Sequence, residues 1–165
     1  MSPETHRFAD DGAIPNSALP VLVYHDVEAA TGAASCEALF GANGWGGHWR
    51  SQILTVHHFH STAHEALGIV AGRASVMLGG PGGERFEIRA GDVLVLPAGT
   101  GHRRLDSSDD LLVVGAYPPG PAWDMRYGDA GEHDEVLANI AAVALPDTDP
   151  VLGADGPLVE LWHRP

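Results

Sequence analysis

The sequence of 165 residues has a single cysteine, few basic side chains and no long apolar run. One cysteine excludes an intrachain disulfide, and we interpret Cys36, which has no partner motif, as a small buried residue without a catalytic role. No stretch approaches the roughly 20 apolar residues of a membrane span. The N-terminus also lacks the basic start and apolar run of a targeting signal. These absences predict a cytoplasmic protein that has no membrane partner.

The scarcity of basic side chains excludes a second class of partner. Nine basic side chains stand against 22 acidic ones, and the formal net charge is −13. Such a charge repels a phosphate backbone, and no segment gathers arginines or lysines into a stripe. We therefore expect no nucleic-acid partner.

What the sequence does contain is typical of a β-rich domain. It has 44% hydrophobic residues, 21 glycines and 12 prolines, which suits a folded protein with many tight turns. Short β-prone runs alternate with Gly-, Pro- and Asp-rich turns, as in a barrel or sandwich. The predicted strands are 19–27, 49–60, 65–71, 74–78, 84–89, 92–96, 102–105 and 111–117.

The length fits one domain. Residues 1–18 are polar and are predicted to form an N-terminal arm that frays or lies along the barrel. Residues 19–165 then form a single domain with a barrel core at about 48–118. A short helix is expected at 35–40, before Gly41. The apolar patch at 136–145 is either a helix or an extended covering segment.

Histidines are the most informative residues of the chain. There are ten, and four of them fall within eight residues: His57, His58, His60 and His64. Alternation along a strand over 49–60 puts His58 and His60 on one face, close enough to bind one ion. His57 and Phe59 then point away from that ion. The pair predicts a metal site.

The residues themselves do not decide which of two neighbours, His64 or Glu65, joins His58 and His60 as a ligand. His64 shares parity with His58 and His60, so an unbroken strand would select it. Glu65 joins the pair only if the chain turns at Ser61-Thr62-Ala63, which is plausible turn chemistry. The next strand would then begin with Glu65 facing inward, above an apolar face.

Two motifs resemble those of the cupin superfamily. His58-Phe-His60-Ser-Thr-Ala-His-Glu65, with six residues before Gly72, resembles the first cupin motif, and Gly91-Asp-Val-Leu-Val-Leu-Pro-Ala-Gly-Thr-Gly-His102 resembles the second. The glycine expected before the first histidine and the asparagine often found after the last one are absent. The stretches IPNSALPVLVY, HSTAHEALGIVAG, GDVLVLPAG and NIAAVALPDTDPV are similar to small bacterial single-domain cupins of the YjlB-like group.

The resemblance implies a fold, a ligand set and an assembly. The fold is all-β, a double-stranded β-helix or jelly-roll barrel with N- and C-terminal extensions, and the chain is expected to form a homodimer. The implied metal ligands are His58, His60, Glu65 and His102, so the resemblance selects Glu65 over His64.

The ligand set favours particular metals. Three imidazoles and one carboxylate suit one divalent transition-metal ion, Fe, Mn, Ni, Co or Zn, rather than Ca or Mg. The site then belongs to a mononuclear metal-dependent enzyme of the dioxygenase, decarboxylase or isomerase type, acting on a small polar or carboxylate metabolite. One alternative is a non-catalytic module that binds or senses a small molecule and carries a structural metal. Another is a metal-free barrel whose histidines act as acid and base groups.

Four further side chains have two readings each. Arg104 shares parity with His102 and either binds a substrate carboxylate or, as we favour, balances nearby aspartates on the surface. Tyr117, Trp45 and Trp49 either line the mouth of the barrel or, as is commoner for aromatic residues at strand ends, pack in the core.

Overall fold

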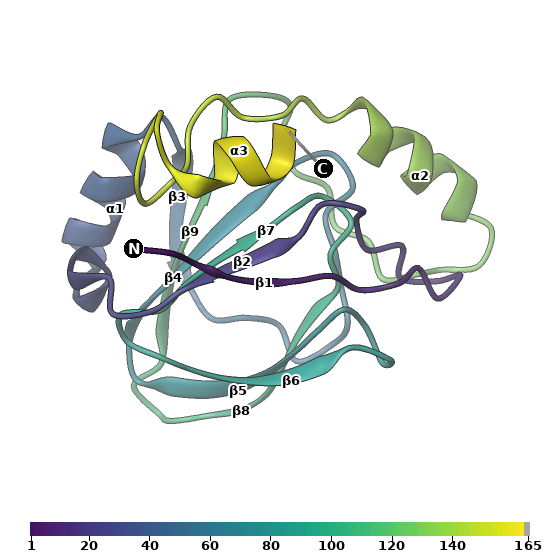
Figure 1. The fold of residues 1–165 in the computed structure, drawn as a ribbon. Coiled ribbons are helices and arrows are strands. Elements are labelled where there is room, and N and C mark those ends of the chain that lie inside the picture. Colours follow the sequence, from purple (N-terminus) through teal and green to yellow (C-terminus); the bar gives the residue numbers. More distant parts are fainter. Residues whose placement is uncertain (164–165) are drawn as a thin grey trace.

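The computed structural model describes residues 1–163. Two antiparallel sheets face each other (Figure 1), one of six strands in the order β1-β2-β7-β4-β9-β3 and one of three in the order β6-β5-β8. The strands are β1 Glu4–His6, β2 Val21–Tyr24, β3 Gly46–Ser51, β4 Glu65–Ala71, β5 Arg73–Leu78, β6 Glu84–Arg89, β7 Val93–Leu96, β8 His102–Ser107 and β9 Leu112–Tyr117. The helices are η1 Glu28–Thr31, α1 Ala33–Ala42, α2 His133–Ala142 and α3 Pro157–His163.

Strand β4 separates two hydrophobic cores because its side chains alternate between the faces of the six-stranded sheet. Leu67 and Ile69 point between the sheets, where they pack with residues of β5 and β7 such as Val76 and Leu94. Ala66 and Val70 point the other way, into a core shared with the helices. Glu65 has the parity of the inner face, so this strand aims its carboxylate into the space between the sheets.

Helix α1 packs closely against the outer face of the six-stranded sheet. A Cβ on Gly68 of β4 would lie 2.4 Å from the sulfur of Cys36, so only glycine permits this approach. Cys36 is completely buried, as predicted, and burial raises the pKa of its thiol to about 12. The thiol is therefore protonated and unreactive at neutral pH.

The first 18 residues lie along the domain rather than apart from it. Strand β1 pairs with β2 and thereby extends the six-stranded sheet. Asn16 is 3% exposed. Its amide donates to the carbonyl of Gly79, and its carbonyl oxygen accepts the amide of Gly101, 3.1 Å away. This contact ties the N-terminal segment to the turn that precedes His102.

Three sequence predictions about secondary structure need correction or completion. The strand predicted over 49–60 ends at Ser51, and beyond it only His58 and Phe59 form isolated bridges. The helix expected at 35–40 is longer, at 33–42, and the apolar patch at 136–145 is largely helix α2. The two-sheet architecture of the predicted jelly-roll barrel is confirmed, with α1 and α3 covering its six-stranded sheet (Figure 1).

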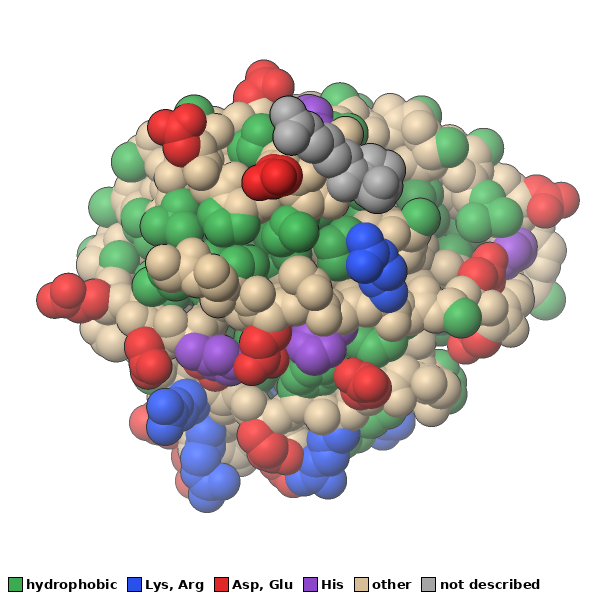
Figure 2. Space-filling model, in the orientation of Figure 1, with side chains coloured by type: hydrophobic (Ala, Val, Ile, Leu, Met, Phe, Trp, Pro, Cys, Tyr) green, Lys and Arg blue, Asp and Glu red, His purple; other side chains and the backbone are tan. Residues whose placement is uncertain are grey.

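Charges on the surface are mixed. On the face shown in Figure 2, basic side chains lie beside acidic ones, and among the ion pairs are Arg85 with Glu87 at 2.9 Å and Arg89 with Asp26 at 3.7 Å. Among residues 1–163, no helix has the length and apolar character needed to cross a membrane.

Candidate metal centre

Three buried histidines converge between the sheets. His102 begins β8, and His58 pairs with it through two backbone hydrogen bonds, of 3.2 and 2.9 Å. His60 follows two residues later on the same side of the chain. One nitrogen from each of His58, His60 and His102 lies within 4.8 Å of the other two. The predicted His-x-His pair and the distant third histidine are therefore brought together.

Backbone carbonyls fix the orientation of all three imidazoles. The Nδ1 atoms of His58, His60 and His102 lie 2.8, 2.5 and 3.0 Å from the carbonyl oxygens of Val56, Asp124 and Thr100. A carbonyl oxygen only accepts, so each Nδ1 carries the proton and donates it. Each ring, when neutral, therefore presents its Nε2 lone pair, the arrangement found in metal-binding histidines.

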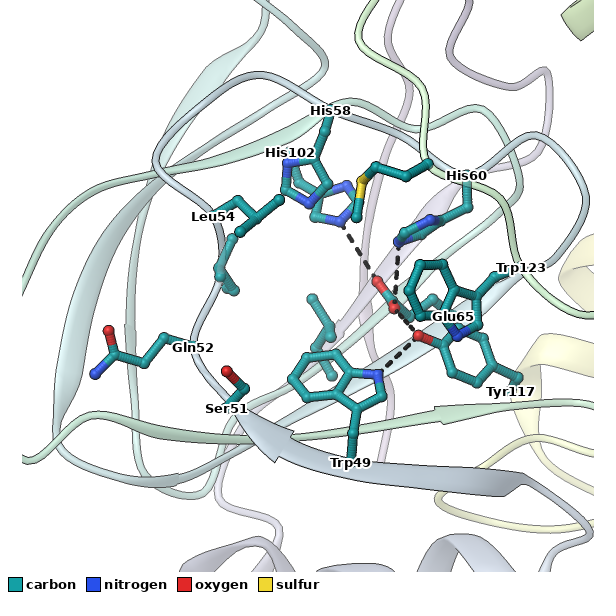
Figure 3. A pocket seen from close by; sticks show the side chains of 13 residues that line it. Trp49, Ser51, Gln52, Leu54, His58, His60, Glu65, His102, Tyr117 and Trp123 are labelled. Carbon is teal, nitrogen blue, oxygen red and sulfur yellow. Dashed lines mark hydrogen bonds and ion pairs between the residues drawn. The ribbon is translucent and has the colours of Figure 1, made fainter.

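Glu65 completes the cluster from the first position of β4. Its Oε1 lies 3.4 Å from Nε2 of His102, and its Oε2 lies 3.4 Å from Nε2 of His60. The Tyr117 hydroxyl donates to Oε2 at 2.7 Å and accepts the indole N–H of Trp49 at 2.7 Å. Figure 3 shows this chain of contacts from Trp49 to the histidines. The carboxylate is thus held in one position.

Burial and charge act in opposite directions on the acid and base groups of the cluster. Burial, the largest effect at Glu65, favours the neutral acid, but hydrogen bonds from His102 and His60 outweigh it and lower the pKa of Glu65. At His60, burial is likewise outweighed by Glu65, and the pKa is raised. At His58 the Glu65 carboxylate has only a small effect, and burial lowers the pKa to about 3. The cluster pairs an ionised carboxylate with a neutral imidazole at His58.

His64, the rival of Glu65 in the sequence, lies on the opposite face. Its Nδ1 accepts the backbone N–H of Ala98 at 2.9 Å, and its Nε2–H donates to the carbonyl of Ala144 at 3.1 Å. Its ring packs against Trp162 of α3, with centroids 4.8 Å apart. Burial lowers the pKa of His64 to about 4. Both ring nitrogens are therefore engaged outside the cluster.

The turn between His60 and Glu65 is held by a single aspartate. The Asp124 carboxylate accepts the backbone N–H groups of Ser61 and Thr62 at 2.6 and 3.2 Å and also the Ser61 hydroxyl. Arg126 donates to the same carboxylate at 2.9 Å. The turn predicted at 61–63 is thus present, and it puts Glu65 on the side of His58 and His60.

A cavity of about 260 Å³ opens beside the cluster. Its walls carry the four predicted ligands together with Trp49, Ser51, Gln52, Ile53, Leu54, Leu67, Tyr117, Trp123 and Met125 (Figure 3). Trp49 and Tyr117 line this cavity, whereas Trp45 is fully buried in the outer core. Arg104 is absent from the lining, and its guanidinium donates to the Ile53 carbonyl at 3.0 Å and the Ser107 hydroxyl at 3.0 Å.

Sequence reasoning missed the loop after β9. Trp123 and Met125 form part of the cavity wall, and Asp124 orients both His60 and the turn. In sequence this segment is rich in Pro, Asp and Gly and shows no strand pattern. The one available signal was chemical, since a metal-binding imidazole needs an acceptor for its second nitrogen.

Two sequence comparisons identify the family of this chain. A family model described as Cupin matches residues 52–117. The uncharacterized protein YjlB of Bacillus subtilis (strain 168) is 39% identical over 162 residues, which are 98% of this chain and 97% of YjlB.

Solved structures align less closely. A Bacillus subtilis oxalate decarboxylase variant aligns with a TM-score of 0.39 at 17% identity, over 70% of this chain and 29% of the enzyme. RmlC from Streptococcus suis, in complex with dTDP-D-xylose, aligns with a TM-score of 0.38 at 14% identity, over 74% of this chain and 72% of RmlC. The assignment rests on the two sequence matches, which span both histidine motifs and nearly the whole of YjlB. The chain belongs to the cupin family.

Proposed function

We propose that His58, His60, His102 and Glu65 together bind one divalent transition-metal ion, Fe, Mn, Ni, Co or Zn. The observation that carries the proposal is the anchoring of all three Nδ1 atoms by backbone carbonyls, which leaves the Nε2 atoms for an ion, in rings that each have one nitrogen within 4.8 Å of the other two. Imidazole nitrogens with one carboxylate are ligands that these metals accept and that Ca and Mg do not favour.

The electrostatics of the cluster support a bound cation. When His60 and His102 are neutral, their Nε2 lone pairs face carboxylate oxygens at 3.4 Å, and two acceptors that face each other repel. Either a proton or a cation between them turns this repulsion into attraction. The Tyr117 hydroxyl donates to only one of the two carboxylate oxygens, which leaves the other oxygen to a proton on His102 or to a cation.

We further propose that the protein is a mononuclear metal-dependent enzyme of the dioxygenase, decarboxylase or isomerase type. When bound, the metal would polarise an oxygen of a coordinated small molecule. The chain's own contribution is to hold Glu65 through Tyr117 and Trp49, to fix the imidazole tautomers, and to line the approach to the site with mostly apolar side chains.

Metal analysis tests the site directly. Protein purified without a histidine tag should carry close to one equivalent of metal, and a His58→Ala/His102→Ala variant should carry almost none. Less than about a tenth of an equivalent in the unmutated protein, even after incubation with Fe(II), Mn(II) or Zn(II), would exclude the proposed centre.

One observation favours the second candidate, a binding module in which the metal anchors a small molecule without turnover. Apart from the four proposed ligands and Tyr117, whose hydroxyl is engaged with Glu65, no acid or base side chain among residues 1–163 lines the cavity. Oxygen consumption and product formation should therefore be measured across a metabolite panel after Fe(II) or Mn(II) loading. Stoichiometric binding without turnover would favour the module over the enzyme.

We also propose a homodimer. Support comes from β3, an edge strand of the six-stranded sheet with four exposed residues among its six, since exposed edges commonly pair with another chain. Light scattering that gives the monomer mass at micromolar concentration would refute it. Cytoplasmic residence stays a prediction from the sequence.

A further inference from the structure

We propose that the cavity binds a molecule with a flat, uncharged apolar body and a single metal-coordinating oxygen group. This inference rests on the proposed metal centre and adds to it the class of ligand. The sequence predicts a small polar or carboxylate metabolite. The inference narrows this class of ligand, because one polar group can bind at the metal and the rest of the cavity is mostly apolar.

The cavity offers no counter-ion for a second charge. Among the described residues, neither arginine nor lysine lines it. Arg104, the candidate considered from the sequence, is bound to the Ile53 carbonyl and the Ser107 hydroxyl. A carboxylate placed in the cavity away from the metal would thus lose its hydration without gaining a partner, which is costly.

Most polar side chains of the lining are already engaged. The indole N–H of Trp49 donates to Tyr117, whose own hydroxyl proton goes to Glu65. The Gln52 amide reaches the Leu111 carbonyl at 3.4 Å. Among the described residues of the lining, the Ser51 hydroxyl and the Gln52 carbonyl oxygen remain for a ligand. A sugar or another polyol would leave most of its hydroxyls without partners in such a site.

Aromatic side chains supply two walls of the cavity. The indole of Trp49 lies across Gly115 of strand β9. A Cβ at this position would come within 2.0 Å of the indole, so the ring can lie there only because the residue is glycine. Trp123 stacks with Tyr117 at 6.1 Å between centroids, and its ring meets that of His60 edge-on at 5.2 Å. A flat ring entering toward the metal would pass beside both indoles (Figure 3).

Size and exposure agree with a ring-sized body. The volume is about 260 Å³, and apolar protein cavities of about 150 Å³ accept a benzene molecule. Trp123 is 44% exposed and Leu54 42% exposed, although both line the cavity. Covering these two apolar side chains with a ligand ring would remove their surface from water and stabilise the complex.

Matched hydroxamates provide the test, since they share one metal-binding group and differ only in the body. Zn(II)-loaded protein is titrated calorimetrically with acetohydroxamate, benzohydroxamate and 4-carboxybenzohydroxamate. We expect benzohydroxamate to bind at least about tenfold more tightly than acetohydroxamate, from burial of its ring. We expect 4-carboxybenzohydroxamate to bind about tenfold or more weakly than benzohydroxamate, because of its added carboxylate.

A Trp123→Ala variant should weaken the binding of benzohydroxamate several-fold more than it weakens the binding of acetohydroxamate. Tyr127→Ala is the matched control, because Tyr127 is an exposed aromatic residue of the same loop that does not line the cavity. Equal affinity for the first two hydroxamates, or tighter binding of the carboxylated one, overturns the inference and leaves the metal centre standing. Failure of the protein to take up Zn(II) overturns both.

Discussion

The neighbouring residues His64 and Glu65 allow one decisive experiment on the metal centre. They lie on opposite faces of the six-stranded sheet, Glu65 against the histidine cluster and His64 against Trp162. We predict that Glu65→Gln weakens metal binding with little effect on the metal-free fold. His64→Leu should do the reverse and destabilise the fold while leaving metal binding intact.

The Glu65→Gln change removes a negative charge but keeps an oxygen that can accept the Tyr117 hydroxyl. Zn(II) at about 100 times its dissociation constant stabilises the native state by about 2.7 kcal/mol. For a domain of this size that raises Tm by roughly 5–11 °C. If the substitution weakens affinity about a hundredfold, the same Zn(II) concentration contributes only about 0.4 kcal/mol, or roughly 1–2 °C.

The His64→Leu change leaves two backbone groups without partners, the N–H of Ala98 and the carbonyl of Ala144. Ala98 is buried whereas Ala144 is exposed and can be hydrated, so one buried unsatisfied group remains and we expect a loss of about 1–3 kcal/mol in the free energy of unfolding. The Tm of metal-free protein should accordingly fall by roughly 2–12 °C, and the increment from Zn(II) should be preserved.

Thermal unfolding followed by circular dichroism, with and without Zn(II), measures both effects, and metal content gives an independent readout. Near-ultraviolet spectra of both variants establish that the aromatic packing is retained. The reasoning is refuted if Glu65→Gln keeps the full Zn(II) increment. It is equally refuted if folded His64→Leu protein loses its metal.

Three other substitutions test particular contacts. Gly115→Ala should displace the Trp49 indole, because the new Cβ would lie 2.0 Å from it; unchanged tryptophan fluorescence would contradict this. Asp124→Asn should lower the free energy of unfolding by about 1–3 kcal/mol, measured in urea, since the amide cannot accept from every donor around it. The hydrogen bond to Asp92 raises the pKa of His25 above its usual 6.5. The protonated ring therefore stabilises the fold below pH 6.5, and this stabilisation is lost as the pH rises through the raised pKa. His25→Gln should cost less than about 1 kcal/mol at about pH 5.5, because the ring is half exposed, and still less at about pH 8.5; the opposite order would exclude the assignment.

The part of the centre that could be predicted from sequence is the part set by local geometry. Alternation placed His58 and His60 on one side, and turn chemistry at 61–63 explained how Glu65 joins that side. The structure has this turn and directs Glu65 inward above Leu67. Parity alone would have chosen His64, so the resemblance to the cupin motif supplied what spacing could not.

The irregular segment after Ser51 was beyond local reasoning. Its carbonyls at 53, 54 and 55 accept from the Arg104 side chain, the Arg104 backbone and the Arg103 side chain, at 3.0, 2.8 and 2.8 Å. These donors lie about fifty residues away in β8 and replace the regular pairing of a strand. An alternating sequence does not reveal that its carbonyls will be satisfied in this way.

The loop after β9 links the metal centre to the cavity through Asp124. Its carboxylate holds the turn that directs Glu65 inward, and its carbonyl fixes the tautomer of His60. The adjacent Trp123 forms a wall of the cavity. A ligand that shifts the Trp123 ring therefore acts on the same short segment that orients a proposed metal ligand. Occupancy of the cavity and the geometry of the metal site should consequently change together, and a substitution that loosens the turn should alter both.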